Sequence, residues 1–135
     1  MKRILFVIIL LVFSGYVFSQ DIEDYCKISI GYGSINGRAI EGKLMPEAVE
    51  WYYISFGEDA YGIEFSTCDS DFNVEMQIWH GCRENERNFL YSNDNMGDCS
   101  ITVDYLPEGT YYIRIYRNRD TFNDGNYKLL ITQNQ

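Results

Sequence analysis

Apolar and polar residues alternate along most of the chain beyond residue 48, and the alternation is clearest in 109–116. Successive side chains of a β-strand point to opposite faces, so this segment predicts one core-facing set and one outward-facing set. Pro107 just before the segment and Gly109 at its start are typical turn residues. The core-facing set is Tyr111, Ile113 and Ile115, and the outward-facing set is Tyr112, Arg114 and Tyr116.

Seven further segments share this character, being short, rich in β-branched and aromatic residues, and bounded by turn-forming residues. No segment after residue 20 shows a helical period over a useful length. Eight short strands at regular spacing predict an all-β protein, an antiparallel sandwich or barrel. The expected strands are 34–39, 49–56, 61–67, 73–79, 88–92, 99–105, 109–116 and 126–132.

Residues 1–19 have the features of a secretory signal peptide. Lys2 and Arg3 precede an apolar run over 4–13, and small residues follow up to Ser19. The run is about half as long as a membrane-spanning helix needs, and a retained signal anchor is the alternative. Cleavage after Ser19 predicts one secreted domain of residues 20–135 that is not inserted in a membrane.

Charge and cysteine content narrow the class of protein further. The chain carries 20 Asp and Glu against 11 Lys and Arg, a formal net charge of −9 at pH 7. This acidity argues against nucleic acid and anionic membranes as partners, since both repel a negative surface. Four cysteines in a small exported domain predict two disulfides, with three pairings open. A zinc site is disfavoured because the cysteines lack a two-residue spacing and the chain has one histidine.

Five short motifs stand in a recognisable order along the chain. They are Glu50-Trp51-Tyr52, Ser66-Thr67-Cys68-Asp69-Ser70-Asp71-Phe72, Asn93-Asp94-Asn95, Gly109-Thr110-Tyr111-Tyr112-Ile113-Arg114-Ile115 and Gly125-Asn126-Tyr127-Lys128-Leu129. In this order and spacing they resemble the bacterial pre-peptidase C-terminal (PPC) domain family, over about 30–132. Asn73 and Asn95 stand where that family usually has aspartate, so no role of those acids carries over.

The resemblance implies a jelly-roll β-sandwich. Counted in chain order, strands two, seven, four and five would form one sheet, and strands one, eight, three and six the other. It also implies a non-catalytic module of the kind attached to secreted hydrolases, some relatives of which bind collagen or polysaccharide. No catalytic residue is expected, because the chain has no G-x-S-x-G motif, Glu75 has no evident carboxylate partner, and His80 is expected on the surface.

The alternating direction of antiparallel strands predicts the disulfide pairing. Loops after expected strands one, three, five and seven gather at one end of the sandwich, here called the first end. Cys68 and Cys99 fall at the first end, whereas Cys26 and Cys82 fall at the second end. Since a disulfide requires α-carbons within about 7 Å, we expect the pairs Cys68–Cys99 and Cys26–Cys82.

Carboxylates also gather in the loops of the first end. Calcium prefers six to eight oxygen ligands, often carboxylates and carbonyls of loops, so these side chains predict a structural calcium site. The alternative is that Asp and Asn shape turns by bonding their own backbone. The candidate calcium ligands are Asp69, Asp71, Asp94 and Asp98.

The strand order implied by the resemblance places many outward-facing aromatic residues on one sheet. Flat rings stack on sugars or on proline-rich chains, and neighbouring polar groups donate and accept hydrogen bonds, so this face predicts binding of an extracellular polysaccharide or protein polymer. Strand five would add Phe89 and Tyr91 if Leu90 faces the core. The predicted ligand-binding residues are Trp51, Tyr53, Gln77, Trp79, Tyr112, Arg114 and Tyr116.

Other interpretations of these features stay open. The aromatic face is also compatible with cross-strand packing, with a cover formed by the loops or by the polar lead-in segment 21–27, or with a dimer or partner interface. A second functional hypothesis is a protein-interaction or protease-associated, inhibitor-like module that uses the acidic loops of the first end.

Overall fold

The computed structural model describes residues 25–45, 48–82, 88–93, 98–117 and 125–134. The predicted signal peptide at 1–19 and the candidate calcium ligand Asp94 lie outside the described residues. Within the described ranges, no helix is long and apolar enough to cross a membrane.

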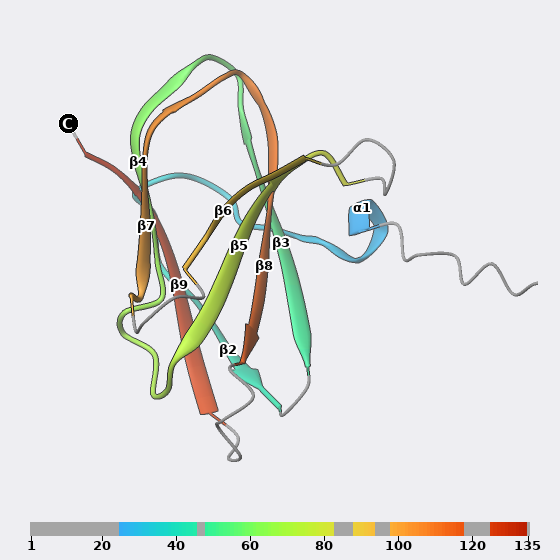
Figure 1. The fold of residues 1–135 in the computed structure, drawn as a ribbon, viewed down its shortest axis with the longest axis vertical. Helices are drawn as coiled ribbons and strands as arrows, with labels where there is room; N and C mark the ends of the chain where they lie inside the picture. The colour runs from blue at the N-terminus through green and yellow to red at the C-terminus, as the bar shows by residue number, and fades with distance from the viewer. Residues whose placement is uncertain (1–24, 46–47, 83–87, 94–97, 118–124, 135) are drawn as a thin grey trace, which may run out of the picture.

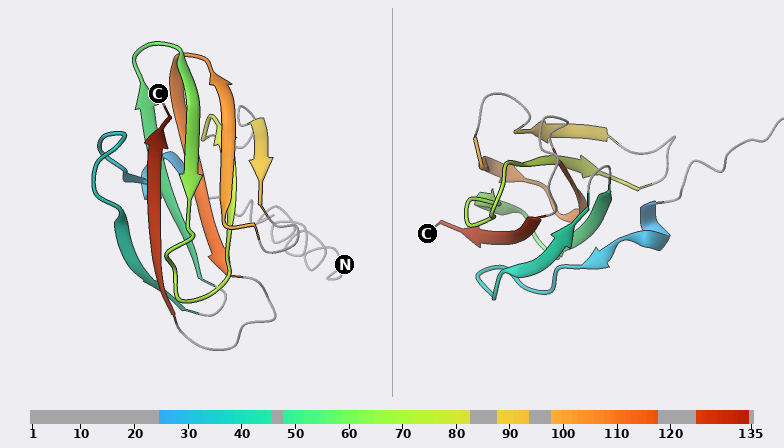
Figure 2. Two further views of the ribbon diagram at one scale, coloured as in Figure 1. Left: turned by 90° about the vertical axis from the view of Figure 1, so that its left-hand side faces the viewer. Right: turned by 90° about the horizontal axis from the view of Figure 1, so that it is seen from below.

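The described residues form two sheets packed face to face, and all their strand pairings are antiparallel except that of β1 with β3 (Figures 1 and 2). The five-stranded sheet has the order β1-β3-β8-β5-β6, and the four-stranded sheet has the order β2-β9-β4-β7. The strands are β1 (Ile30–Gly31), β2 (Ile40–Leu44), β3 (Val49–Phe56), β4 (Ala60–Ser66), β5 (Val74–His80), β6 (Asn88–Ser92), β7 (Ser100–Leu106), β8 (Gly109–Arg117) and β9 (Gly125–Gln133), and one short helix, α1 (Tyr25–Ile28), precedes them.

The predicted all-β sandwich is confirmed. Seven of the eight expected strands agree with β3 to β9 within one residue at each end. Both sheets contain the strands, in the order, that the resemblance implies, and β1 is added beside β3 as a short parallel strand. Alternating hydrophobicity was therefore a reliable guide to the strands, because each buries one face against the other sheet.

The first expected strand, 34–39, is wrong, since the chain forms β2 at Ile40–Leu44 instead. Asn36 has a φ of 59°, in the left-handed region, and the Gly37 amide donates to the Ser34 carbonyl over 3.3 Å. These residues form a turn rather than a strand, as asparagine and glycine readily do. Ile35, which suggested a strand, packs against the core from this turn.

The core lies between the sheets and is made of inward-facing residues at alternating positions along the strands. Tyr52, Ile54, Val74, Met76, Ile78, Tyr111, Ile113, Ile115, Tyr127, Leu129 and Ile131 are each at most 3% exposed. These include the core-facing set predicted for 109–116. The hydroxyls of Tyr52 in one sheet and Tyr127 in the other are hydrogen-bonded to each other across this core.

Both predicted disulfides are confirmed. The α-carbons of Cys68 and Cys99 are 4.8 Å apart, and those of Cys26 and Cys82 are 5.2 Å apart. The first disulfide joins the segment after β4 to the start of β7, where the Thr67 amide also donates to the Cys99 carbonyl over 2.8 Å. The second ties α1 to the segment that follows β5, at the second end.

Candidate binding face

A row of four aromatic side chains crosses the outer side of the five-stranded sheet. Tyr53 pairs with Tyr112, Tyr112 pairs with Trp79, and Trp79 pairs with Phe89, on β3, β8, β5 and β6 in turn. Paired residues of neighbouring strands point to the same face of a sheet, so the four rings stand side by side. We call Tyr53, Tyr112, Trp79 and Phe89 the aromatic row.

The aromatic row both packs the sheet and presents ring surface to solvent. The ring centroids of Tyr53 and Tyr112 are 6.2 Å apart, and those of Trp79 and Phe89 are 5.1 Å apart. Such contacts stabilise neighbouring strands. Tyr53 is 39% exposed and Phe89 is 50% exposed, whereas Tyr112 and Trp79 between them are half-buried. The accessible ring surface is therefore greatest at the two ends of the row.

A polar cluster lies beside the aromatic row on the same face. The Gln77 Oε1 atom accepts hydrogen bonds from Arg114 Nη1 over 3.1 Å and from Trp79 Nε1 over 3.3 Å. The Arg114 guanidinium carbon lies 4.5 Å from the centroid of the Tyr116 ring, a cation–π contact. Six of the seven predicted binding residues are thus brought together on an accessible face with their side chains held in place.

The seventh predicted residue, Trp51, is not accessible. Its register opposite Arg114 places it on the outer face as expected, and it is not a member of the core cluster between the sheets. Its side chain is nevertheless 4% exposed, so the expectation that it lies open to solvent is wrong. β1 is the edge strand beside β3, and Gly31 lies next to the Tyr53 ring. The segment that contains β1 therefore borders the outer face along the strand that carries Trp51.

The position of β6 residues is decided by an irregularity in its pairing with β5. The register shifts between Ile78 and Trp79, so that Tyr91 pairs with Ile78 and Phe89 pairs with Trp79. Ile78 faces the core and Trp79 faces outward, so Phe89 joins the outer face and Tyr91 does not. The expectation that both would share the outer face is therefore corrected.

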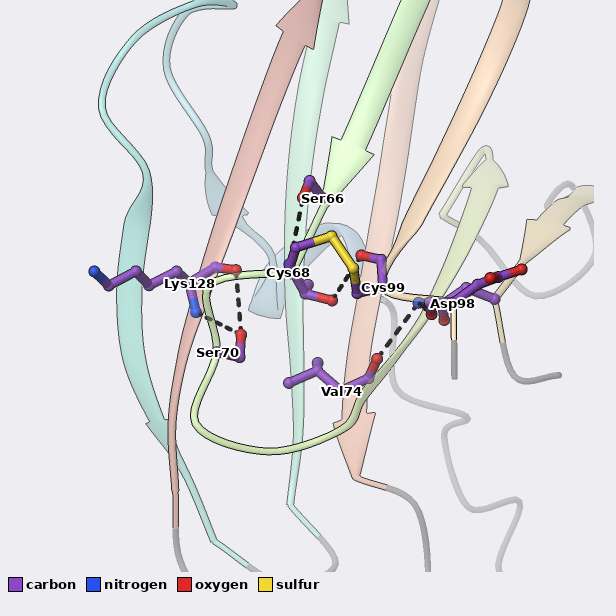
Figure 3. The surroundings of a disulfide bond; sticks show 9 residues. Ser66, Cys68, Ser70, Val74, Asp98, Cys99 and Lys128 are labelled. Atoms are coloured by element: carbon purple, nitrogen blue, oxygen red, sulfur yellow. Dashed lines mark hydrogen bonds between the residues drawn. A yellow bond between two sulfur atoms is a disulfide. The ribbon is translucent and has the colours of Figure 1, made fainter. Parts of the chain in front are cut away.

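In the described part of the first end, the loop that carries Asp69 and Asp71 is hydrogen-bonded to β9. Ser70 Oγ accepts from the Lys128 amide over 2.9 Å, and Asp71 Oδ2 accepts from the Asn126 side chain over 3.2 Å. Figure 3 shows Ser70 and Lys128 on one side of the Cys68–Cys99 disulfide and Asp98 on the other. These contacts hold the loop against β9, and the Ser70 amide also donates to the Thr67 carbonyl over 3.1 Å, a bond within the turn.

Calcium binding by Asp69, Asp71, Asp94 and Asp98 stays a prediction. Among the residues that the structure describes, no three or more His, Cys, Asp or Glu side chains are grouped to hold a metal ion, and Asp94 is not among them. A melting temperature that falls when calcium is chelated would support the site, and one that does not change would reject it.

His80, the chain's histidine, has a structural environment. Its ring stacks on Tyr111 with centroids 5.0 Å apart, and its Nε2 atom lies close to Gly109. A nucleophile activated by histidine would have to be within hydrogen-bond reach of this ring. The contacts made by His80 are instead those of an exposed side chain that covers the end of β8.

A second exposed aromatic pair was not predicted from the sequence. Tyr61 and Tyr105 lie opposite each other on β4 and β7, and are 59% and 45% exposed. Strict alternation with the buried residues Ile63 and Val103 would turn both tyrosines into the core. Both are exposed instead. Gly62, which follows Tyr61 and has φ of 62°, breaks the alternation of β4, and a glycine inside a strand was the available signal.

The comparison with solved structures supports the fold. The sequence matches no protein-family model, and no curated protein is significantly similar to it. Among solved structures, it resembles the pre-peptidase C-terminal domain of collagenase from Bacillus anthracis, with 18% identity and a TM-score of 0.54, over 77% of this chain and 92% of that one. It also resembles PliG of Aeromonas hydrophila, a periplasmic inhibitor of g-type lysozyme, with 13% identity and a TM-score of 0.55, over 77% of this chain and 94% of that one. The PPC-like resemblance is therefore confirmed at the level of the fold.

Proposed function

We propose that the chain is a secreted, non-catalytic binding module that holds an extracellular polysaccharide or protein polymer across the aromatic row. The observation that carries the proposal is the alignment of Tyr53, Tyr112, Trp79 and Phe89 over four adjacent strands. Neighbouring strands are about 4.8 Å apart, so three intervals make a row about 14 Å long. A row of that length suits several units of an extended chain better than a single small molecule.

The chemistry of the row supports a ligand with flat apolar faces and polar edges. Exposed ring surface of Tyr53 and Phe89 stacks on the C–H faces of sugars or on proline-rich chains. Gln77 and Arg114 beside the row supply amide and guanidinium groups that bond hydroxyls and carbonyls. Because these two side chains are already bonded to each other, they would lose little rotamer freedom on binding.

The cellular setting supports the same proposal. Two disulfides are typical of proteins in oxidising compartments, which include the bacterial periplasm and the extracellular space. The two solved structures of similar fold are an accessory domain of a collagenase and a periplasmic inhibitor. Neither name describes a catalytic domain, which is consistent with a binding role for this chain.

Retention on insoluble cellulose, chitin and collagen tests the proposal. We expect the protein to bind one of these polymers, and Tyr53→Ala and Phe89→Ala to weaken binding about tenfold each, since an aromatic contact contributes about 1–2 kcal/mol. Met45→Ala, which removes a side chain that is 57% exposed away from the row, is the matched control. Trp51→Ala is a poor test because that side chain is buried. Failure to bind any polymer, or equal losses in the control, would reject the proposal.

The second candidate is a protein-interaction or inhibitor-like module that uses the acidic loops of the first end. The fold shared with a lysozyme inhibitor favours it. Co-purification of a protein partner in place of a polymer, with binding lost in Asp69→Asn and kept in Tyr53→Ala, would support this candidate against the first.

A further inference from the structure

A hollow lies at the second end of the sandwich, where the β3–β4 and β7–β8 connections run next to each other at the top of Figure 1. Its volume is about 360 Å³, and it is lined by the turn at 33–35, by the β3–β4 turn and by Gln133. Glu58 and Asp59 on its wall are exposed. A space of this size is within the range of ligand pockets and accommodates a long side chain.

An exposed pair of tyrosines adjoins the hollow on the outer side of the four-stranded sheet. The ring centroids of Tyr61 and Tyr105 are 5.3 Å apart, with an angle of 41° between the ring planes. Large apolar side chains that are about half exposed and in mutual contact are unusual on a polar sheet face. The pair offers the faces of two electron-rich rings to solvent.

Hydrogen bonds join the tyrosine pair to the wall of the hollow. Asp59 Oδ2 accepts from the Tyr105 hydroxyl over 3.1 Å, and Asp59 Oδ1 accepts from the Glu108 amide over 2.9 Å. On the other side, Gln133 Nε2 donates to the Tyr61 carbonyl over 3.0 Å. The hollow and the two rings therefore form one continuous surface, which we call the acidic–aromatic surface.

The charge on this surface is negative and is not balanced by the described basic residues. Glu58, Asp59 and Glu108 are exposed, and none of them forms an ion pair with a lysine or arginine in the part of the chain that the structure describes. The hydrogen bond to Asp59 raises the pKa of the Tyr105 hydroxyl, which is the effect of a nearby negative charge. The whole chain carries a net charge of −9.

We propose that the acidic–aromatic surface binds a lysine or arginine side chain on an exposed segment of a partner protein. Cations are attracted to the faces of tyrosine rings and form charge-assisted hydrogen bonds with carboxylates, and both groups converge here. The negative charge of the chain complements a basic partner and speeds their encounter. This surface is separate from the aromatic row, which lies on the other sheet, and from the acidic loops of the first end.

Titration followed by NMR tests the proposal. The 15N-labelled protein with both disulfides formed is titrated with the blocked peptide acetyl-Gly-Arg-Lys-Gly-amide and with its Gln-Gln counterpart. We expect the basic peptide alone to shift the amide signals of 57–62, 104–106, 108, 109 and 133. We expect Tyr61→Ala and Asp59→Asn each to weaken binding at least fivefold. Glu64→Gln, which removes one negative charge from β4 outside the hollow, should leave binding unchanged. Raising the salt from 50 to 500 mM weakens the binding.

Three results would overturn the proposal. The first is the absence of shifts in these segments at millimolar peptide. The second is an even spread of shifts over the acidic surface, with the same loss in Glu64→Gln as in Asp59→Asn, because that pattern is nonspecific charge attraction. The third is equal binding of the Gln-Gln peptide. Both variants keep the strand backbone, and the dispersion of their NMR spectra reports whether they are folded.

Discussion

The Tyr52 and Tyr127 hydroxyls are hydrogen-bonded to each other between the two sheets, and the edge of one ring meets the other ring with centroids 6.4 Å apart. Both side chains are at most 3% exposed. A buried hydroxyl that loses its partner is more costly than a pair that is removed together. This hydrogen bond therefore joins β3 of one sheet to β9 of the other, and the stability of each buried hydroxyl depends on the other.

A double-mutant cycle measures that pair. We expect Tyr52→Phe and Tyr127→Phe each to lower the free energy of unfolding by about 1–3 kcal/mol, because each leaves the other hydroxyl buried without a partner. The double variant should be more stable than the sum of the single losses predicts, since no orphan hydroxyl remains. Urea unfolding supplies the free energies. Additive losses would show that the two hydroxyls do not depend on each other.

The same tyrosines predict a loss of stability in alkali. Burial is the main reason that the pKa values of Tyr52 and Tyr127 lie above the ordinary value of 10.0. Below pH 10 the folded and unfolded states both keep these protons. Above pH 10 the unfolded state ionises first and the folded state holds more protons, so the free energy of unfolding falls as the pH rises.

Urea unfolding between pH 8 and pH 11.5 checks this prediction. The protein should lose stability progressively above about pH 10, and the double variant Tyr52→Phe with Tyr127→Phe should lose it with a smaller slope. Tyr32 and Tyr111, whose pKa values are raised chiefly by burial, and Tyr105, whose pKa is raised chiefly by its hydrogen bond to Asp59, contribute to the remaining slope. An unchanged slope in the double variant would contradict the assignment.

The side chain of Asn93 forms hydrogen bonds with the backbone of β5, so its removal should lower the stability of the protein. Its side-chain Oδ1 accepts from the Met76 amide over 2.6 Å, and its Nδ2 donates to the Asp98 carbonyl over 3.0 Å and to the Val74 carbonyl over 3.4 Å. Asn93→Ala would leave these buried groups unpaired and lower the free energy of unfolding by about 2–3 kcal/mol. Asn88→Ala, at an exposed position at the start of β6, is the control and should change it by less than about 0.5 kcal/mol.

Most of the sandwich follows from local patterns, but the outer face does not. Alternation correctly assigned Tyr111 and Ile113 to the core, because one side of each strand must be buried. The placement of Phe89 depends on a shift in pairing between two strands, which is a property of the pair rather than of either sequence. The burial of Trp51 likewise depends on groups outside its own strand, which the alternation in β3 does not describe.

The same limit applies to the acidic–aromatic surface. Tyr61 is exposed where Gly62, which has a left-handed φ, breaks the alternation of β4, and Tyr105 lies opposite it on β7. A glycine inside a strand signals an irregularity, but Gly62 alone does not show which neighbouring side chains turn outward. Asp59 lies in the β3–β4 connection and Tyr105 lies on β7, so their contact depends on the assembled sheet.

We expect the Cys26–Cys82 disulfide to hold the segment 25–32, which contains α1 and β1, against the rest of the protein. It joins residues 56 apart, against 31 for Cys68–Cys99, so loop closure predicts a stabilisation of about 4 kcal/mol for the longer loop and slightly less for the shorter one. The Cys68–Cys99 junction is also held by hydrogen bonds from Thr67, whereas the segment 25–32 is held beside β3 by the two paired positions of β1 in the strand ladder and one further backbone bond.

Cys26→Ser with Cys82→Ser should therefore release the segment 25–32 as well as lower global stability. The Tyr32 amide, which donates to the Tyr53 carbonyl over 2.9 Å, should then exchange its hydrogen much faster, while it stays protected in Cys68→Ser with Cys99→Ser. Equal protection of that amide in the two double variants would show that the segment 25–32 is held by its backbone contacts with β3 and not by the disulfide.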